Sequence, residues 1–411
     1  MKFYSLIGLL ATASSVCAQT PLTWDQVKAR FEAANPNLKA GQLNIQESKA
    51  QEITAYLRPN PNFNMSADQI TPFTGNPYRP FAALLTGVSV DYLHERQHKR
   101  ELRLESAKQG TDIAESQQED LERNLLFNLR TAFVQTLQAQ RLLANARDNL
   151  DYFNRELAIS QERLKAGDIA KVDFDRLALQ KVQYEQDLQT AQVNLRTSKI
   201  TLLMLLNDRT PVDRFDIAGP FAFKEQIPSL EDFHSIALAT RPDLKAAMQA
   251  VEKAQTDHRL AVANGSTDPT FSANLGRLPP AYVGFSVNIP LRIFDRNQGE
   301  KARTQIDIAH AERQEDAQKA QVFSDVDSAY YIVASNIDLL KPYNGPDGYL
   351  QTALRIRDTI SYSYQQGQAA LVDYLDAQRD YRATEVAFIN LMGSYLQAVT
   401  QLNMAVGREA M

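Results

Sequence analysis

Residues 94–101 have the sequence HERQHKRE and carry the pattern in the chain that most suggests chemistry. They contain H-E-x-x-H, in which a helix offers two histidines to a zinc ion and a glutamate to the attacking water. His94 and His98 would be the metal ligands, and Glu95 would be the general base. A zinc peptidase is therefore the first hypothesis to weigh.

A catalytic zinc site needs a third protein ligand beside an open coordination position. The extended motif would place a third histidine where this chain has Leu104. Glu119 and Glu122 are predicted to lie on the same long helix, roughly 30 Å along its axis from His98. We therefore expect no catalytic residue, no metal site and no cofactor. Residues 94–98 are interpreted as a polar, basic junction between a strand and a helix, or at most an adventitious surface metal site.

The composition excludes further classes of function. The 411 residues carry a net charge of −5, with five histidines and one cysteine. This charge gives no broad basic surface for nucleic acid. A single cysteine allows neither an intrachain disulfide nor a Cys/His zinc cluster.

The first twenty residues, MKFYSLIGLLATASSVCAQT, have the features of a secretory signal peptide: a positive Lys2, a short apolar run and small residues before a cleavage site. We predict a signal peptide over residues 1–18, removed after Ala18. Lipidation of Cys17 is the alternative, although the residues before it match that pattern poorly. No later run is long and apolar enough for a transmembrane helix.

Long helices are predicted by the spacing of proline, which is absent between Pro80 and Pro211, between Pro290 and Pro342, and after Pro346. Apolar or small residues recur in steps of four and three from 139 to 164 and from 174 to 205, as in the seam of a coiled coil. The intervening KAGDIAKVD would be the tip of a long antiparallel hairpin.

The same hairpin recurs 200 residues later. Gly167 and Asp173 correspond to Gly367 and Asp373, and NPNLKA near the start resembles RPDLKA at 241–246. We therefore predict two copies of one unit.

Each unit also contains two stretches of strictly alternating polarity, at about 61–69 and 82–93, then about 269–277 and 281–290. These strands could form a small sheet packed on helices, or part of a membrane barrel with an apolar outer face and a polar lumen. Four strands cannot close a barrel alone, so their edges would need partners.

The predicted fold is thus mostly α-helical with a membrane β-barrel portion. It comprises a signal peptide (1–18), a first repeat (19–210, hairpin about 94–206), a connector (211–229) and a second repeat (230–411, hairpin about 292–406). Residues 341–348, KPYNGPDG, should interrupt the second long helix.

This plan resembles the TolC family of outer-membrane efflux proteins. The resemblance is carried by NPNL, by the GD…VD…L…Q tip around 167–180 and by YQQGQAALVDYLDAQRDY at 364–381. NIPLRIFDRNQGEKA at 288–302 is most similar to the CzcC-like and CusC-like heavy-metal branch.

The resemblance implies a homotrimer in the outer membrane of a Gram-negative bacterium, with one twelve-stranded barrel and a helical tunnel through the periplasm. It would contact outer-membrane lipid and passively conduct the cargo of an inner-membrane pump, of the resistance-nodulation-division type, and its periplasmic adaptor. Heavy-metal cations are the expected cargo. Drug efflux and type I secretion are alternatives within the family, and an exported coiled-coil structural protein is the alternative of another class.

The family also implies a periplasmic gate. Its V-D-x-L-D-A segment is Val372–Ala377 here, so Asp373 and Asp376 would line the narrowest ring, where crowded carboxylates favour cations. Their spacing alone equally fits the solvated face of a coiled coil. Tyr364 matches a tyrosine that latches the closed tip, but the arginine that joins it in the family is Ala369 here.

The hairpin tips would meet the adaptor in this family, an assignment compatible with glycines that simply end helices. The tip residues are Gly167, Asp168, Ile169, Gly367, Gln368 and Ala369.

Overall fold

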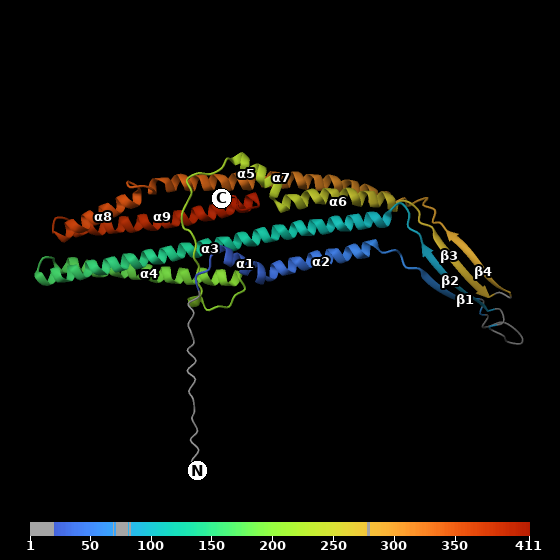
Figure 1. The fold of residues 1–411 in the computed structure, drawn as a ribbon, viewed down its shortest axis with the longest axis horizontal. Helices are drawn as coiled ribbons and strands as arrows, with labels where there is room; N and C mark the ends of the chain where they lie inside the picture. The colour runs from blue at the N-terminus through green and yellow to red at the C-terminus, as the bar shows by residue number, and fades with distance from the viewer. Residues whose placement is uncertain (1–19, 69, 71–80, 82–83, 278–279) are drawn as a thin grey trace, which may run out of the picture.

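The computed structural model describes residues 20–68, 70, 81, 84–277 and 280–411. Long helices run side by side, and a small sheet extends from one end of an elongated molecule (Figure 1). The prediction of a mostly helical chain with a minor β portion is confirmed. The predicted signal peptide, with Cys17, lies outside the described residues.

Short helices, two strands and long helices follow one another in each half of the described chain. The first half contains α1 (Trp24–Ala34), α2 (Pro36–Tyr56), β1 (Asn62–Asp68), β2 (Leu85–Leu93), α3 (Lys99–Ala166) and α4 (Lys171–Leu205). The second contains α5 (Leu230–Thr240), α6 (Pro242–Asn264), β3 (Thr270–Arg277), β4 (Ala281–Asn288), α7 (Gln298–Leu340), α8 (Tyr349–Gln365) and α9 (Leu371–Val406). Two short 3₁₀ turns are η1 (Val212–Arg214) and η2 (Lys341–Tyr343).

Helix α3 has 68 residues, which makes it about 100 Å long at 1.5 Å per residue. It begins at Lys99 rather than at 94, so the expected start was wrong. Gln97 and His98 have φ values of 59° and 54°, which a right-handed helix does not allow. The second long helix is divided at η2, within the segment 341–348 that was expected to interrupt it.

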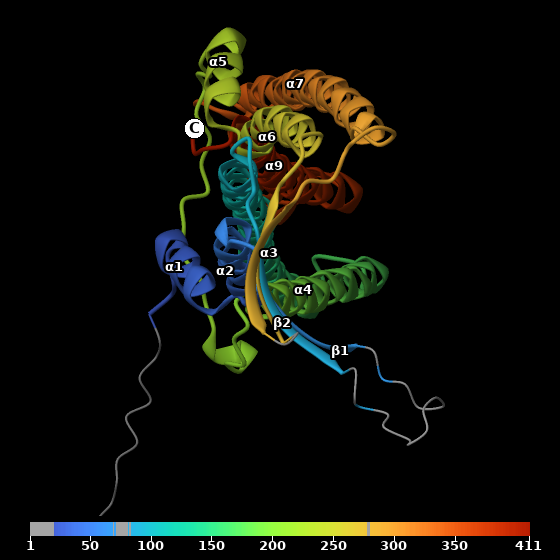
Figure 2. The same cartoon turned by 90° about the vertical axis from the view of Figure 1, so that its right-hand side faces the viewer.

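The helices pack in one layer. On the sheet side, α2 contacts α3, α3 contacts α6 and α6 contacts α7. Away from the sheet, α4 and α9 pack on α3, and α8 packs on α9. Seen from the sheet end, this layer is curved (Figure 2). The α3–α4 and α8–α9 turns both lie at the end of the molecule opposite the sheet (Figure 1).

The described strands form one antiparallel sheet in the order β1-β2-β3-β4. Val90 pairs with Phe63 and Ala273, and Ala273 pairs with Phe285. Because paired residues point to the same side of a sheet, the alternating apolar side chains of all four strands share one face. The other face carries polar side chains: Asn62, Asn64, Ser66, Ser89, Asp91, Ser272, Asn274, Ser286 and Asn288.

The apolar face of this sheet is exposed. The exposed fractions of Phe285 and Met65 are 84% and 76%. Figure 1 shows the strands extending beyond the helix ends, so no described helix covers this face. A small sheet packed on helices is therefore not what the described residues form.

Buried side chains hold the helical layer together. One cluster joins α1, α3 and α4 to the connector through residues such as Phe31, Phe133, Leu202 and Phe215. A second cluster joins α5, α7 and α9. Burial of these apolar side chains is the main force that fixes the helices against one another.

The connector after α4 runs across the helices to α5, near the middle of the long axis (Figure 1). It is tied to the start of the chain, since the Leu22 N–H donates to the Asp216 carbonyl at 2.9 Å and the Ala218 N–H donates to the Leu22 carbonyl at 2.9 Å. Ile217 of the connector is buried in the first cluster. This segment therefore braces both halves of the layer.

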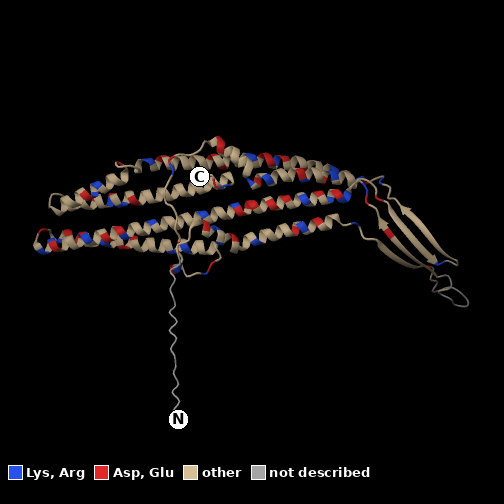
Figure 3. Cartoon of the chain, in the orientation of Figure 1, with Lys and Arg blue, Asp and Glu red and all other residues tan. Residues whose placement is uncertain are grey.

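Charged residues of both signs lie along the helices, whereas the strands are almost free of them (Figure 3). The charged residues within the strand bounds are Asp68, Asp91 and Arg277. The helices thus suit water and the strands suit a less polar environment.

Candidate functional site

The H-E-x-x-H residues do not lie on a helix. His94 follows β2, where its N–H donates to the Pro269 carbonyl at 2.9 Å, whereas His98 is the residue immediately before α3. Glu95 is occupied in a two-point ion pair with Arg103, in which Nη2 lies 2.9 Å from Oε2. The geometry of a helical zinc site is therefore absent here.

The described residues also contain no group of three or more His, Cys, Asp or Glu side chains placed to hold a metal ion. The strand-to-helix junction interpreted from the sequence is the arrangement found. The junction is held by Lys99, whose Nζ donates to Asp268 Oδ2 at 2.6 Å and to the Ser266 carbonyl at 3.0 Å.

Both hairpin tips have the same geometry. Gly167 and Gly367 have φ values of 85° and 74°, in the left-handed region. The Asp168 N–H donates to the Arg163 carbonyl at 2.9 Å, and the Gln368 N–H donates to the Ser363 carbonyl at 2.8 Å. Bonds of this kind, with a left-handed glycine, close the end of an α-helix and allow the chain to reverse. Each tip therefore presents its exposed turn at the far end of the molecule.

Asp373 and Asp376 lie in the first turns of α9, both with exposed side chains. The Ala370 N–H donates to Asp373 Oδ2 at 3.4 Å, so this carboxylate also caps the start of the helix. Asp376 lies 3.2 Å from Arg379, one turn along. Within one chain the two aspartates are thus accessible charges close to the α8–α9 tip.

Tyr364 is buried and contacts both hairpins. Its ring stacks on Tyr374 with a centroid distance of 5.0 Å. Arg163 of α3 donates from Nη1 to the Tyr364 carbonyl at 3.0 Å, and its guanidinium lies 5.2 Å from the Tyr364 ring centroid. Burial raises the pKa of the Tyr364 hydroxyl. An arginine does meet this tyrosine, but it comes from the first hairpin.

Sequence reasoning missed Arg163. It lies four residues before Gly167, and the residue 200 positions later is Ser363, so the repeat gave no parallel for it. The one available signal was a basic residue in the last turn of α3.

Further polar contacts join the hairpins above the tips. Gln365 Nε2 donates to both carboxylate oxygens of Glu156 at 3.0 Å, and Tyr152 donates to Ser361 Oγ at 3.0 Å. The Arg357 guanidinium lies 4.5 Å from the Tyr152 ring centroid and 4.1 Å from that of Tyr381. These contacts accompany a buried apolar and aromatic cluster, in which Phe153 and Leu177 of the first hairpin pack with Leu371 and Tyr374 of the second.

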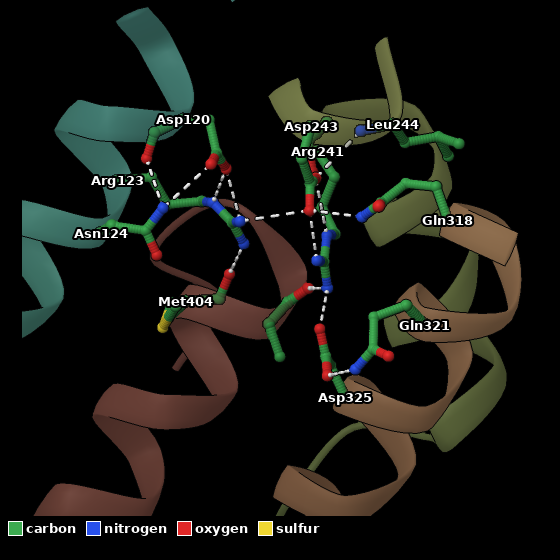
Figure 4. A network of polar contacts seen from close by, with 12 residues as sticks. Asp120, Arg123, Asn124, Arg241, Asp243, Leu244, Gln318, Gln321, Asp325 and Met404 are labelled. Atoms are coloured by element: carbon green, nitrogen blue, oxygen red, sulfur yellow. Dashed lines mark hydrogen bonds and ion pairs between the residues drawn. The ribbon is translucent and has the colours of Figure 1, made fainter. Parts of the chain in front are cut away.

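A charged network joins the two halves of the chain near the end of α9 (Figure 4). Arg123 of α3 donates to the Met404 carbonyl at 2.7 Å and lies 3.3 Å from Asp243. Arg241, only 3% exposed, contacts Asp243 at 2.5 Å and Asp325 of α7 at 2.8 Å. Because the last carbonyls of a helix lack partners within it, these arginines also complete the end of α9.

The pKa values within this network reflect its charge pairs. Burial alone would raise the pKa of Asp243, but the bond from Arg241 and the charges of Arg241 and Arg123 outweigh it and lower that pKa below its ordinary value. Burial alone would lower the pKa of Arg241, whereas Asp243 and Asp325 together raise it. Asp243 and Arg241 are therefore both ionised around neutral pH.

None of the helices in the described part of the chain combines the length and the apolar composition needed to cross a bilayer.

Residues 234–408 match the model of the family described as "Outer membrane efflux protein". The chain is 22% identical over 401 residues to the cobalt-zinc-cadmium resistance protein CzcC of Cupriavidus metallidurans, covering 95% of this chain and 91% of CzcC. It is 25% identical over 338 residues to the pyoverdine export outer membrane protein OpmQ of Pseudomonas aeruginosa, covering 79% of this chain and 69% of OpmQ.

The fold is similar to that of CusC, whose crystal structures concern folding and transmembrane channel formation. The TM-score is 0.78 at 18% sequence identity, with 93% of this chain and 92% of the CusC chain covered. At this level of identity the likeness concerns the fold.

Proposed function

We propose that this chain, which belongs to the outer-membrane efflux proteins, forms as a homotrimer the outer-membrane duct of a tripartite export system. It is an outer-membrane protein that extends into the periplasm. Proteins of this family are channels rather than enzymes. The duct would passively conduct what an inner-membrane pump, of the resistance-nodulation-division type, and a periplasmic adaptor deliver to it.

The sheet is the observation that carries this proposal. One face is apolar and exposed, the other is polar, and β1 and β4 leave two unpaired edges. Exposed edges and apolar faces are unfavourable in water. If β4 of one protomer paired with β1 of the next, three protomers would close a twelve-stranded barrel, apolar toward lipid and polar toward a lumen.

The helical layer supports the same assembly. Its outer helices expose large apolar side chains, including Leu179 and Met204 on α4 and Ile306 and Tyr331 on α7. In a ring of three curved layers these helices would face neighbouring copies. An exported coiled-coil structural protein could use such surfaces too, but it would leave the amphipathic sheet unexplained.

We assign the repeats to residues 19–210 and 230–411, with 211–229 as the connector between them. In the trimer the tips would meet the periplasmic adaptor, because they are the exposed end of the molecule farthest from the sheet (Figure 1). The tip residues are Gly167, Asp168, Ile169, Gly367, Gln368 and Ala369.

The closed tip would be latched by Tyr364 together with Arg163, which takes the place of the family arginine missing at Ala369. The hydrogen bond and the guanidinium–ring contact of Arg163 hold α3 against the α8–α9 turn. Separation of the two hairpins would open the duct.

Asp373 and Asp376 would line the constriction below this latch. Three protomers would bring six carboxylates toward one axis, and a ring of carboxylates favours cations. The similarity to CzcC supports heavy-metal cations as cargo. The similarity to OpmQ, a pyoverdine exporter, supports export of an organic molecule as the second candidate.

Conductance in planar bilayers tests the constriction. The double variant Asp373→Asn/Asp376→Asn should lower the K⁺ over Cl⁻ permeability ratio by at least about threefold, because the fixed negative charge of the ring is removed. The matched control is Asp338→Asn/Asp347→Asn, which removes two exposed carboxylates near η2 and should leave the ratio unchanged. Equal selectivity in the wild type and the first double variant would remove these aspartates from the constriction.

Cell fractionation and a deletion strain test the duct and its cargo. We expect a heat-modifiable trimer in outer-membrane fractions, whereas a soluble periplasmic rod would support the structural alternative. The deletion strain should become sensitive to zinc, cobalt, cadmium or copper. Sensitivity to a drug panel alone would favour the organic cargo.

A further inference from the structure

A cavity of about 410 Å³ lies at the junction between β2 and α3. Its walls come from the strand end and junction, residues 92–98, from the first turn of α3, and from Arg58 and Pro59 before β1. This is the place where the sheet gives way to the helices (Figure 1). The H-E-x-x-H residues line this cavity, and the proposed duct function gives them no role.

The cavity has a surplus of positive charge. Glu95 is paired with Arg103 through both oxygens, and Glu101 lies 2.9 Å from Arg100. The pKa of Glu101 is lowered by hydrogen bonds from its own backbone and from Arg100. Every carboxylate that lines the cavity therefore already has an arginine partner.

Arg58 and Arg96 also line the cavity. Within the described part of the chain, neither side chain makes an ion pair or a hydrogen bond, and the imidazoles of His94 and His98 make none either. Two guanidinium groups and two imidazoles thus remain available to a ligand. Their chemistry suits a phosphate group, since guanidinium binds phosphate oxygens through paired hydrogen bonds.

The wall of the cavity is held in an unusual conformation. Gln97 and His98 are consecutive non-glycine residues with positive φ. They are fixed on both sides, because the Arg96 N–H donates to Asp268 Oδ1 at 3.0 Å and Lys99, 3% exposed, binds Asp268 Oδ2 at 2.6 Å. Left-handed residues of this kind persist only where neighbours enforce them, as at binding sites.

The position of the cavity along the long axis of the molecule indicates which molecule supplies the phosphate. In the second half of the chain, the corresponding junction between β4 and α7 exposes Leu291, Ile293 and Phe294, the last with an exposed fraction of 90%. Both junctions lie at the same end of the helical layer (Figure 1). Apolar and aromatic side chains beside arginines are typical of the level of lipid headgroups.

We propose that this cavity binds the phosphate of an anionic phospholipid headgroup in the periplasmic leaflet of the outer membrane. Arg58 and Arg96 would provide the charge, with a ring N–H of His94 and of His98 as further donors. The proposal rests on the proposed function, since only a sheet in the membrane puts the cavity at headgroup depth. Bound lipid would fix the height of the duct in the bilayer.

Native mass spectrometry of the purified assembly tests the site. The assembly is equilibrated with equal amounts of phosphatidylglycerol and phosphatidylcholine, and the retained lipids are counted. The wild type should retain phosphatidylglycerol preferentially. Arg58→Gln/Arg96→Gln should lose this preference by at least about tenfold, since each basic residue near an anionic surface strengthens attraction about fivefold. Arg196→Gln/Arg313→Gln, which removes two exposed arginines from α4 and α7, is the control and should match the wild type.

Three outcomes would overturn the proposal. The first is equal retention by the wild type and the Arg58/Arg96 variant. The second is displacement of the lipid by millimolar inorganic phosphate, which would make the site one for free phosphate. The third is a heat-labile assembly of the Arg58/Arg96 variant with unchanged lipid preference, which would mean that a neighbouring copy covers the cavity.

Bilayer conductance of the same samples separates the two proposals. A variant that still inserts and conducts but shows no lipid preference contradicts only the headgroup site. Failure of the wild type to insert or conduct contradicts the duct itself.

Discussion

Individual side chains decide how the two hairpins of this protein hold together. The resemblance implied an arginine at the position of Ala369, whereas the residue that contacts Tyr364 is Arg163 from the other hairpin. An arginine on either hairpin could make these two contacts. The tyrosine carbonyl needs a hydrogen-bond donor, and the ring face attracts a positive charge.

We predict that Arg163→Gln loosens the closed tip. The lost bond and ring contact should reduce the stability of the closed state by about 1–2 kcal/mol, since the site is partly exposed. The open fraction would then rise about tenfold, seen as higher or more frequent conductance in single-channel recordings. The control is Arg155→Gln, an exposed arginine two turns earlier on α3. Identical recordings for the two variants would show that Arg163 does not latch the tip.

At the scale of elements, glycine decides where the long helices end. Gly167 and Gly367 reverse the chain with the same pair of hydrogen bonds, so two helices of very different length, α3 and α8, end in the same way. The helix start at Lys99 is decided differently, by the left-handed residues and the Asp268 contacts before it. A helix end that depends on local hydrogen bonds can be predicted from the sequence. A helix end that depends on a residue distant in the sequence cannot.

The tip glycines allow a test that separates a helix cap from a docking surface. Gly367→Ala should lower stability by about 1 kcal/mol, because alanine is strained at positive φ. No atom lies within 4 Å of the added Cβ, so the fold should be kept. Gly367→Asn should cost less, since asparagine tolerates this conformation. The stabilities are compared by thermal melts followed by circular dichroism.

Cross-linking to the adaptor then reports docking in the same variants. If the tip docks closely, Gly367→Asn should melt at a temperature between those of Gly367→Ala and the wild type but cross-link weakly, because its side chain projects from the tip. Normal cross-linking of the asparagine variant would restrict this glycine to the role of a cap.

At the scale of the whole molecule, the network of Figure 4 fastens the first half of the chain to the second. Arg123 from α3 and Arg241 before α6 converge on Asp243 and on the carbonyl end of α9. Neither half contains the complete set of charges. The pairing of these charges therefore requires the assembled fold.

We predict that this network makes stability fall at low pH. The pKa of Asp243 is lower in the folded state than in the unfolded state, so its contribution is complete above about pH 3.9 and is lost as the pH falls through the folded-state value. At pH 7, Asp243→Asn should cost about 2–4 kcal/mol, because Arg241 would lose a buried partner. The measurement is the melting temperature at pH 7, 5, 4 and 3. The difference between the wild type and the variant should shrink toward pH 3, and a constant difference would exclude this origin.

Local pattern determined much of this protein from the sequence alone. Alternation of polarity and the spacing of proline predicted strands and long helices, because strand and helix periodicities are properties of neighbouring residues. The resemblance to outer-membrane efflux proteins rested on such patterns and is confirmed by the family match and the relatives.

Tertiary structure alone decided the contacts between distant residues. Arg163 meets Tyr364 across 201 residues, and Lys99 meets Asp268 across 169. The second contact holds the strand-to-helix junction that the sequence had suggested at residues 94–98, so His94 and His98 are not one helical turn apart. Spacing along a chain predicts which side chains meet only when a continuous element joins them, and here the chain leaves a strand and turns before the helix begins.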